Sequence, residues 1–146
     1  MIQTTVFTPQ KLPSKQEKQA IVDFLFQHLE QFGDPVGDIE KAVDYALKIS
    51  DSFGGFVLAG HLDNELVGAV VVNRTGMSGY IPENILVYIA THRKHRGKGH
   101  GKALMKKTIE LAEGAVALHV EPDNPARYLY EKVGFTNKYL EMRLVN

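Results

Sequence analysis

The sequence predicts a single α/β domain in which a mixed sheet is packed between helices. Segments with the two-residue period of strands and segments with helical period follow each other in the order strand, two helices, three strands, helix, strand, helix, strand. The chain of 146 residues contains no internal repeat, low-complexity tract or composition break that would mark a linker. We therefore expect one domain over residues 1–146, since this length supports one core and is short for two.

Composition excludes several classes of protein. Hydrophobic residues make up 44% and charged residues 23% of the chain, as in soluble globular proteins. Lys and Arg balance Asp and Glu at 17 each, which disfavours a general nucleic-acid-binding protein. No apolar run has the length of a membrane span, and the first residues lack a signal-peptide pattern. With no cysteine, there is no disulfide, thiolate nucleophile or cysteine metal site, and a cytoplasmic protein is expected.

The first third of the chain predicts a strand and two helices. Residues 2–7 read as the strand. Ser14 and Glu17 form a capping box, after which apolar residues recur at helical spacing at Ile21, Phe24, Leu25, Leu29 and Phe32. Residues 33–35, Gly-Asp-Pro, end this helix. Asp38 is expected to cap a second helix, whose apolar stripe is Ile39, Ala42, Val43, Ala46 and Leu47.

The middle of the chain changes to strand periodicity. Residues 55–61 and 65–73 predict a hairpin, because the Asp-Asn pair within residues 62–64 supplies turn chemistry. Residues 74–84, with two glycines and a proline, predict a loop. The strand at residues 85–91 is so apolar that we expect it to be buried on both faces.

The last third predicts two helices and two strands. The first helix carries Leu104, Thr108, Leu111 and Ala112 on one side, and residues 115–121 form a strand. Asp123 or Asn124 begins the second helix, which Gly134 ends as a left-handed residue. Residues 135–145 return to the alternation of a strand.

A glycine-rich turn at residues 96–101 precedes the first of these helices. The first turn of a helix leaves backbone N–H groups without partners at the positive end of the helix dipole, which suits an anion. Glycines at 97, 99 and 101 remove the Cβ atoms that would hold a diphosphate away from those groups. Seven of the 17 Lys and Arg lie within residues 92–107, so the local field is positive.

The spacing of the glycines excludes two familiar phosphate-binding motifs for this turn. Lys102 and Leu104 stand where a dinucleotide fingerprint needs glycine, and no Gly-Lys here is followed by the Ser or Thr of a P-loop. The remaining pattern, Arg96-x-x-Gly99-x-Gly101, resembles the coenzyme A pyrophosphate motif of the GNAT superfamily of acyltransferases. A second stretch, residues 123–135, resembles the later motif N-x-x-A-x-x-L-Y-x-x-x-G-F of that superfamily. The resemblance covers about Val67 to Phe135.

The resemblance implies a mostly antiparallel sheet with one splayed parallel strand pair and about four helices. It implies that acetyl-CoA is the donor substrate and lies between the parted strands, with no metal. The implied donor contacts are Ile89, Ala90 and Thr91 for the amide arm, Arg96, Gly97, Lys98, Gly99, His100, Gly101 and Lys102 for the pyrophosphate, and Asn124 for the pantetheine. In this sequence Asp123 occupies the usual asparagine position and Asn124 follows it, while Thr91, Arg93 and His100 replace commoner residue types.

The resemblance and the chemistry together suggest catalytic residues. Tyr130 is expected to protonate the departing thiolate, because a phenol has a pKa close to that of an alkylthiol. A main-chain N–H near Ile89 is expected to polarise the thioester carbonyl. Glu83 is the first candidate for the general base, and Glu121, His119 or a water relay are alternatives. Clustered cations around His92, His95 and His100 argue against a metal site there.

The expected reaction is transfer of an acetyl group to a primary amine of a small molecule or peptide. By the same resemblance, residues 32–38 and 136–140 would hold the acceptor, and Asp34 and Asp38 are suited to attract a cationic amine. The short segment after Phe135 leaves little room for a wide hairpin, so the second subunit of a homodimer is a candidate for that wall. A non-catalytic acyl-CoA sensor and a generic nucleotide-phosphate binder remain the alternatives.

Overall fold

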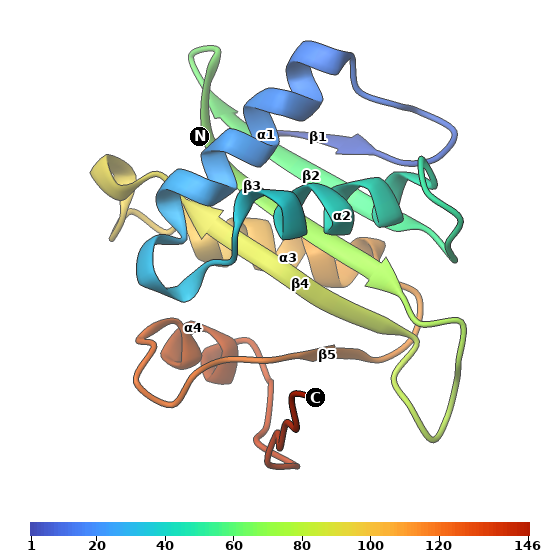
Figure 1. Ribbon diagram of the computed structural model, residues 1–146. Coiled ribbons are helices and arrows are strands. Elements are labelled where there is room, and N and C mark those ends of the chain that lie inside the picture. Colours follow the sequence, from blue (N-terminus) through green and yellow to red (C-terminus); the bar gives the residue numbers. More distant parts are fainter.

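The computed structural model describes residues 1–146 as one mixed sheet with helices on both faces (Figure 1). The strands lie in the order β1-β2-β3-β4-β5. α1 and α2 cover one face of the sheet and α3 covers the other. The elements are β1 (Gln3–Phe7), α1 (Lys15–His28), η1 (Glu30–Phe32), α2 (Val36–Leu47), β2 (Gly55–Leu62), β3 (Glu65–Arg74), β4 (Asn84–Thr91), η2 (Arg93–His95), α3 (His100–Leu111), β5 (Val116–Leu118) and α4 (Ala126–Lys132).

The capping box at the start of α1 is present as predicted. Ser14 Oγ accepts from the Glu17 amide at 3.0 Å, and Glu17 Oε1 accepts from the Ser14 amide at 2.8 Å. The α-helix ends at His28, and the last predicted residues continue as the short 3₁₀ turn η1. This tighter end agrees with the Gly-Asp-Pro sequence that follows, because proline disfavours helical backbone at the residue before it. No helix of the molecule combines the length and apolarity needed to cross a bilayer.

α2 begins earlier than predicted. Its N-cap is Pro35, and Asp38 lies inside the first turn, where its amide donates to Pro35 O at 3.0 Å. The expectation that Asp38 caps this helix was therefore wrong. Proline can precede the first turn because it needs no hydrogen-bond partner for an amide proton, and the Asp38 carboxylate is favourable in the first turn through the helix dipole.

The hairpin between β2 and β3 forms as predicted, with Asp63 and Asn64 at φ of 48° and 67°. β4 carries a bulge, because Tyr88 pairs with Val71 while Leu86 pairs with Val72, so that Val87 has no partner. The bulge turns Leu86 and Tyr88 toward different core clusters. No residue of β4 is exposed: four are buried and four half-buried, and the strand contributes buried side chains to both core clusters.

Two hydrophobic clusters fill the two sides of the sheet. The first lies under α1 and α2, and the second holds Leu104 and Met105 of α3 and Tyr130 of α4 against the opposite face. Gly134 follows α4 with φ of 110°, as expected for a glycine that ends a helix. This second cluster packs α4 on the same side of the sheet as α3.

β4 and β5 are parallel but pair only over three residues, from Asn84–Val116 to Leu86–Leu118. Beyond Leu118 the two strands part, so the predicted strand at 115–121 ends three residues early. A strand is maintained by pairing with a neighbour, and after Leu118 no neighbouring strand lies on either side. The parting confirms the splayed parallel pair.

The predicted last strand is absent. All residues from 136 to 146 are exposed, and none of them makes a backbone hydrogen bond to another residue. Alternation of side chains alone does not form a strand, because backbone N–H and C=O groups need the edge of another strand as partner. The prediction for residues 135–145 was therefore wrong for the single chain.

Candidate functional site

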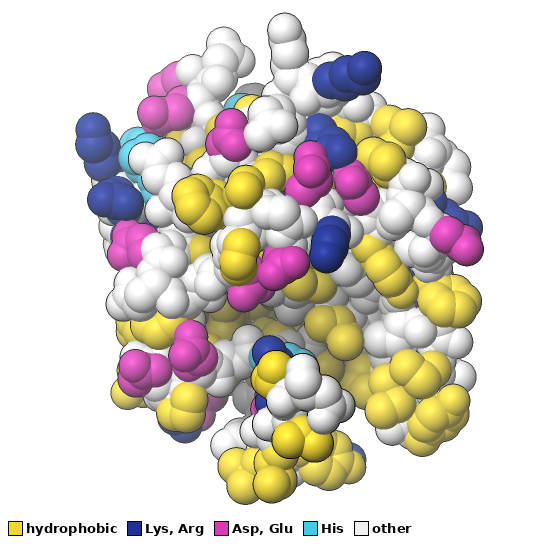
Figure 2. Space-filling model, viewed as in Figure 1, with side chains coloured by type: hydrophobic (Ala, Val, Ile, Leu, Met, Phe, Trp, Pro, Cys, Tyr) yellow, Lys and Arg dark blue, Asp and Glu magenta, His cyan; other side chains and the backbone are white.

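A cavity of about 1410 Å³ opens where β4 and β5 part. Its lining comes from residues 85–91 of β4, the glycine turn, the chain after β5, α4, the η1 segment and part of the C-terminal segment. In the space-filling view the surface is hollowed above the C-terminal segment (Figure 2). The predicted donor-binding and catalytic residues all line this cavity except Glu83 and Lys98. Of the predicted acceptor residues, Asp34 lines it, whereas Asp38 and residues 136–140 do not.

Ile89, Ala90 and Thr91 form the β4 wall of the cavity. One edge of this segment pairs with β3, in the register of Ile89 with Val70. The other edge faces the space left by β5, so its backbone groups have no strand partner. An extended amide chain inserted there can pair with this edge as an added strand does.

The glycine turn presents bare backbone to the cavity. Gly97 and Gly99 have φ of 78° and 83°, and a Cβ added at either would meet no atom within 4 Å. Gly99 is the N-cap of α3, and the amides of His100, Gly101 and Lys102 have no partner. A Cβ on Gly101 would lie 3.2 Å from Leu129 Cδ2. The turn therefore offers free N–H donors at the positive end of a twelve-residue helix.

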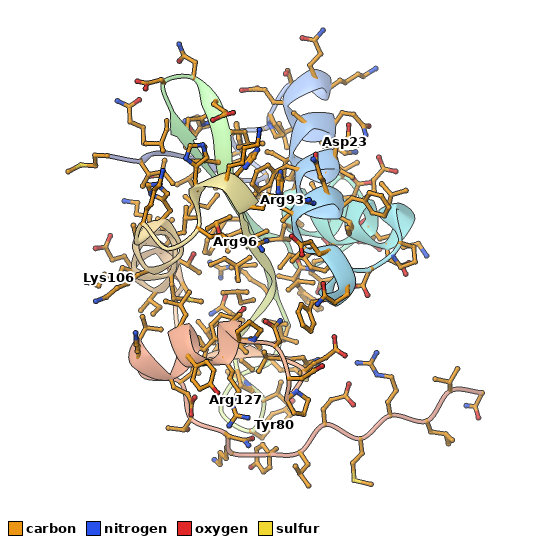
Figure 3. The ribbon with its side chains drawn as sticks, turned by 90° about the vertical axis from the view of Figure 1, so that its left-hand side faces the viewer. Asp23, Tyr80, Arg93, Arg96, Lys106 and Arg127 are labelled. Atoms are coloured by element: carbon orange, nitrogen blue, oxygen red, sulfur yellow. The ribbon has the colours of Figure 1, made fainter.

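Arg96 connects the glycine turn to the end of α1. Its Nη2 donates to His28 O at 2.7 Å, and its Nη1 lies 3.3 Å from Glu30 Oε1. Figure 3 shows Arg93 and Arg96 on the side of α1, and Lys106 on the outer side of α3. Arg96 thus holds the turn in place, and two of its guanidinium nitrogens are already engaged in contacts within the protein.

A row of histidine rings supports the same turn. The rings of His28 and His92 lie 4.2 Å apart, those of His92 and His95 5.4 Å apart, and those of His95 and His100 6.3 Å apart. His28 Nδ1 accepts from the Arg93 amide at 3.3 Å. Burial lowers the pKa of His28, and the positive charges nearby lower it further. No cluster of three His, Asp or Glu side chains suited to a metal ion is present.

Tyr130 of α4 lines the cavity with its ring packed against Phe135, 6.1 Å between centroids. The residue is 8% exposed, and its hydroxyl has no hydrogen-bond partner in the protein. Burial raises the pKa of Tyr130 to about 12, because the phenolate loses hydration. The phenol is therefore protonated at neutral pH and free to donate.

Asn124 lies at the start of α4 and lines the cavity. Its Oδ1 accepts from the Ala126 amide at 2.9 Å, which fixes the first turn of the helix. The side-chain Nδ2 has no partner in the protein and is available as a donor. Asp123, the other candidate for this position, also lines the cavity.

Glu83 lies away from the other predicted residues. It precedes β4 at the end of the strand opposite to Thr91, and its Oε1 accepts from the Ala115 amide at 3.1 Å. The carboxylate packs against Gly114, where an added Cβ would lie 2.7 Å from Glu83 Cδ. Its observed contacts hold the turn before β5. The alternatives His119 and Glu121 both line the cavity.

One polar pair of the cavity was not predicted from the sequence. The hydroxyl of Tyr88, a residue 8% exposed, donates to Asp34 Oδ2 at 2.5 Å, and both residues line the cavity. Burial and the Asp34 carboxylate raise the pKa of Tyr88 well above its usual value. Asp34 had been expected near an acceptor. The only available signal for Tyr88 was a hydroxyl within an otherwise apolar strand.

Comparison with known proteins gives a consistent result. Residues 21–135 match the model of the acetyltransferase (GNAT) family. No curated protein sequence matches the chain. Among solved structures, an acetyltransferase of the GNAT family from Streptococcus pneumoniae TIGR4 is 17% identical with a TM-score of 0.71, covering 100% of this chain and 98% of its own.

Two further structures share the fold. An aminoglycoside acetyltransferase from an uncultured soil metagenomic sample has a TM-score of 0.69 at 18% identity, over 100% of this chain and 99% of its own. A ribosomal-protein-alanine N-acetyltransferase from Brucella melitensis biovar Abortus 2308 has a TM-score of 0.65 at 18% identity, with the same coverage. Since the family model spans most of the sequence, this chain belongs to the GNAT family of acetyltransferases.

Proposed function

We propose that the protein is an N-acetyltransferase that moves an acetyl group directly from acetyl-CoA to a primary amine. The observation that carries this proposal is the cavity at the parted strands, which brings the free edge of β4, the glycine turn and Tyr130 into one space. The names of two structural neighbours, an aminoglycoside and a ribosomal-protein-alanine acetyltransferase, support an amine acceptor.

The donor is bound mainly through backbone. The amides of His100, Gly101 and Lys102 take the pyrophosphate, where the helix dipole and the Lys102 ammonium favour negative charge. Gly97 and Gly99 leave the space that the phosphates need. Lys98 lies outside the lining and adds only to the positive field, while Arg96 holds the turn.

The other end of the donor extends along β4. Its amide arm pairs with the free edge at Ile89, Ala90 and Thr91, and the Asn124 Nδ2 donates to a pantetheine oxygen. This arrangement directs the thioester toward the bulge of β4 and toward Tyr130.

The chemistry follows from this placement. The amine nitrogen attacks the thioester carbonyl, forming the C–N bond, and a main-chain N–H near Ile89 stabilises the oxyanion. Collapse of the intermediate breaks the C–S bond, and Tyr130 gives its proton to the departing thiolate. The attacking nitrogen loses its remaining extra proton to water as the amide forms, and the phenolate is reprotonated from solvent. Tyr130 begins each cycle protonated, because its pKa lies well above neutral pH.

The acceptor ammonium must lose a proton before it attacks. His119 and Glu121 line the cavity and are the better placed candidates for this base, directly or through water. Glu83 could serve only by leaving its hydrogen bond to the Ala115 amide. Three separate variants, His119→Ala, Glu121→Gln and Glu83→Gln, identify the base. Protonation of the base makes kcat/KM fall at low pH, and this fall should be absent in the variant that lacks the base.

The experiment that tests the proposal measures coenzyme A release over an acceptor panel, alongside calorimetric titration with acetyl-CoA. We expect binding of acetyl-CoA and turnover with at least one class of primary amine. Tight binding without turnover on any amine would identify a non-catalytic acyl-CoA sensor instead. ATP that binds as tightly as acetyl-CoA would identify a generic nucleotide-phosphate binder.

A further inference from the structure

The Asp34 carboxylate lines the cavity from the segment between α1 and α2. Its Oδ2 accepts from the hydroxyl of Tyr88 at 2.5 Å, and Tyr88 is only 8% exposed, so a buried side chain of β4 holds the carboxylate in place. In Figure 1 this segment lies beside the end of β4. Asp34 itself is exposed, and its Oδ1 has no partner in the protein. The cavity therefore contains a fixed carboxylate with one free oxygen.

The charge of this carboxylate is not neutralised within the protein. Two other carboxylates of the cavity wall pair with arginines, Glu30 with Arg96 and Glu141 with Arg143, whereas Asp34 forms no ion pair. A free carboxylate in this position favours a cation. Coenzyme A thioesters carry phosphates and no cationic group, so the donor does not supply that cation. The positive charge that Asp34 attracts therefore belongs to the acceptor.

A nitrogen held by Asp34 is not the nitrogen that attacks the thioester. Attack requires the lone pair of a neutral amine, whereas an ion pair with a carboxylate stabilises the protonated amine. The candidate bases His119 and Glu121 follow β5, the other strand of the parted pair. Tyr130, a residue 8% exposed whose hydroxyl has no partner, lies in the core cluster on the opposite face of the sheet from that of Tyr88. The acceptor therefore needs two nitrogens, one that loses a proton near the thioester and one that stays charged at Asp34.

We propose that the acceptor is a diamine or polyamine, in which Asp34 holds one ammonium group while a primary amine a few carbon atoms away is acetylated. The inference rests on the proposed acetyl transfer and adds the chemical class of the acceptor to it. Tyr88 is a positioning residue in this arrangement, because its hydroxyl fixes the direction of the free Asp34 oxygen.

A simple diamine should then be acetylated only once. The reacting ammonium gives one proton to the base before attack, the C–N bond forms, and the second extra proton passes to water. The C–S bond breaks, and the thiolate takes the Tyr130 proton, so the products are coenzyme A and a monoacetylated diamine. An amide nitrogen carries no charge at neutral pH. The product therefore keeps a single ammonium group, which does not satisfy both positions of the site.

Matched pairs of amines test the second charge. Each diamine in a series from diaminopropane to diaminohexane is compared with the monoamine of the same carbon chain, so that the two substrates differ by one amino group. At the best chain length we expect kcat/KM to be higher for the diamine by about tenfold or more. Mass spectrometry of the products should show one acetyl group per diamine with acetyl-CoA in excess.

Variants of the cavity wall assign this preference to Asp34. Asp34→Asn removes the charge while its amide oxygen can still accept from the Tyr88 hydroxyl, and the diamine-to-monoamine ratio of kcat/KM should fall to about one. Tyr88→Phe keeps the ring in the core but releases the carboxylate, so the ratio should also fall while the Kd for acetyl-CoA stays that of the wild type. Asp38→Asn removes the same charge outside the cavity lining and is the matched control, with the wild-type ratio expected.

The possible outcomes separate this inference from the proposed function. Equal kcat/KM for every diamine and its monoamine, or an Asp34→Asn variant that keeps the wild-type ratio, would overturn the diamine assignment and leave acetyl transfer intact. Turnover with no amine in the series or in the wider acceptor panel would overturn both.

Discussion

The Tyr88 hydroxyl donates a 2.5 Å hydrogen bond to Asp34 Oδ2, joining the middle of β4 to the segment between α1 and α2 inside the cavity. Tyr88 follows the bulge of β4 and precedes Ile89, where the donor thioester is proposed to lie. The bond leaves Asp34 Oδ1 available to a second donor. An acceptor ammonium held there would be adjacent to the thioester.

Asp34→Ala tests this acceptor position. Loss of a carboxylate that pairs with a cationic amine should raise the KM for that amine by about tenfold or more, while the Kd for acetyl-CoA stays unchanged. Initial rates over an amine titration and calorimetry with the donor measure the two quantities. Asp38→Ala is the matched control, because Asp38 lies in the next helix, outside the cavity lining. An equal rise in KM for both variants would show a general charge effect and not a subsite.

Gly99→Val tests backbone access at the glycine turn. A side chain at this position would occupy the open space beside the free amides, so we expect the Kd for acetyl-CoA to rise more than tenfold. Lys106→Ala removes a charge outside the cavity and should change the Kd by less than about threefold. Isothermal titration measures both.

Backbone strain needs its own control in this experiment. Gly79 has φ of 75°, close to the 83° of Gly99, and also has open space around its Cβ position, but it lies in the loop before β4. Gly79→Val should therefore cost similar stability while the Kd for acetyl-CoA remains that of the wild type. If Gly79→Val weakened the donor as much as Gly99→Val, global destabilisation would explain the effect.

Most of the fold and the conformation of the glycine turn were predictable because they depend on local sequence. The capping box at Ser14, the Asp63-Asn64 turn and the glycine turn are each specified by a few adjacent residues. The bulge that separates Leu86 from Tyr88 was not predictable, since it depends on the register with β3. The Tyr88–Asp34 contact was also not predictable from the sequence, because it joins residues 54 positions apart.

Two of the wrong predictions have a common cause. Asp38 has good capping chemistry, yet Pro35 fixes the backbone three residues earlier and α2 starts there. Residues 135–145 have good strand alternation, yet they pair with neither of the edge strands β1 and β5. In both cases a local preference was overridden by the geometry of neighbouring backbone, which a residue pattern does not contain.

Tyr130→Phe tests the proposed acid. Removing the proton donor while keeping the ring should lower kcat by about 10²-fold or more and leave the Kd for acetyl-CoA unchanged. The variant keeps the packing against Phe135, so its fold should be intact. A thiol-trapping assay of coenzyme A release measures kcat. A variant with wild-type kcat would show that solvent protonates the thiolate.

The raised pKa of Tyr130 also predicts an alkaline loss of stability. Because the folded-state pKa is about 12 and the ordinary value is 10.0, the unfolded chain loses this proton first as pH rises. The stabilisation is complete below pH 10 and is lost progressively as pH rises toward 12. Urea unfolding of wild type and Tyr130→Phe should show a steeper decline for the wild type in this window. Parallel declines would argue that the phenol is hydrated in the folded state.

The lowered pKa of His28 predicts a loss of stability at acidic pH. Its pKa is lowered from 6.5, first by burial and then by His92, Arg93 and Arg96, so the folded state favours the neutral ring. The unfolded chain binds the proton more readily, and stability is therefore complete above pH 6.5 and falls as pH drops below it. Protonation would also remove the acceptor that His28 Nδ1 offers to the Arg93 amide, and with it support for the glycine turn.

His28→Gln keeps an acceptor without a titrating ring, so urea unfolding between pH 7 and pH 5 should show a smaller decline for this variant than for the wild type. Identical declines in the two proteins would place the acid sensitivity in other groups.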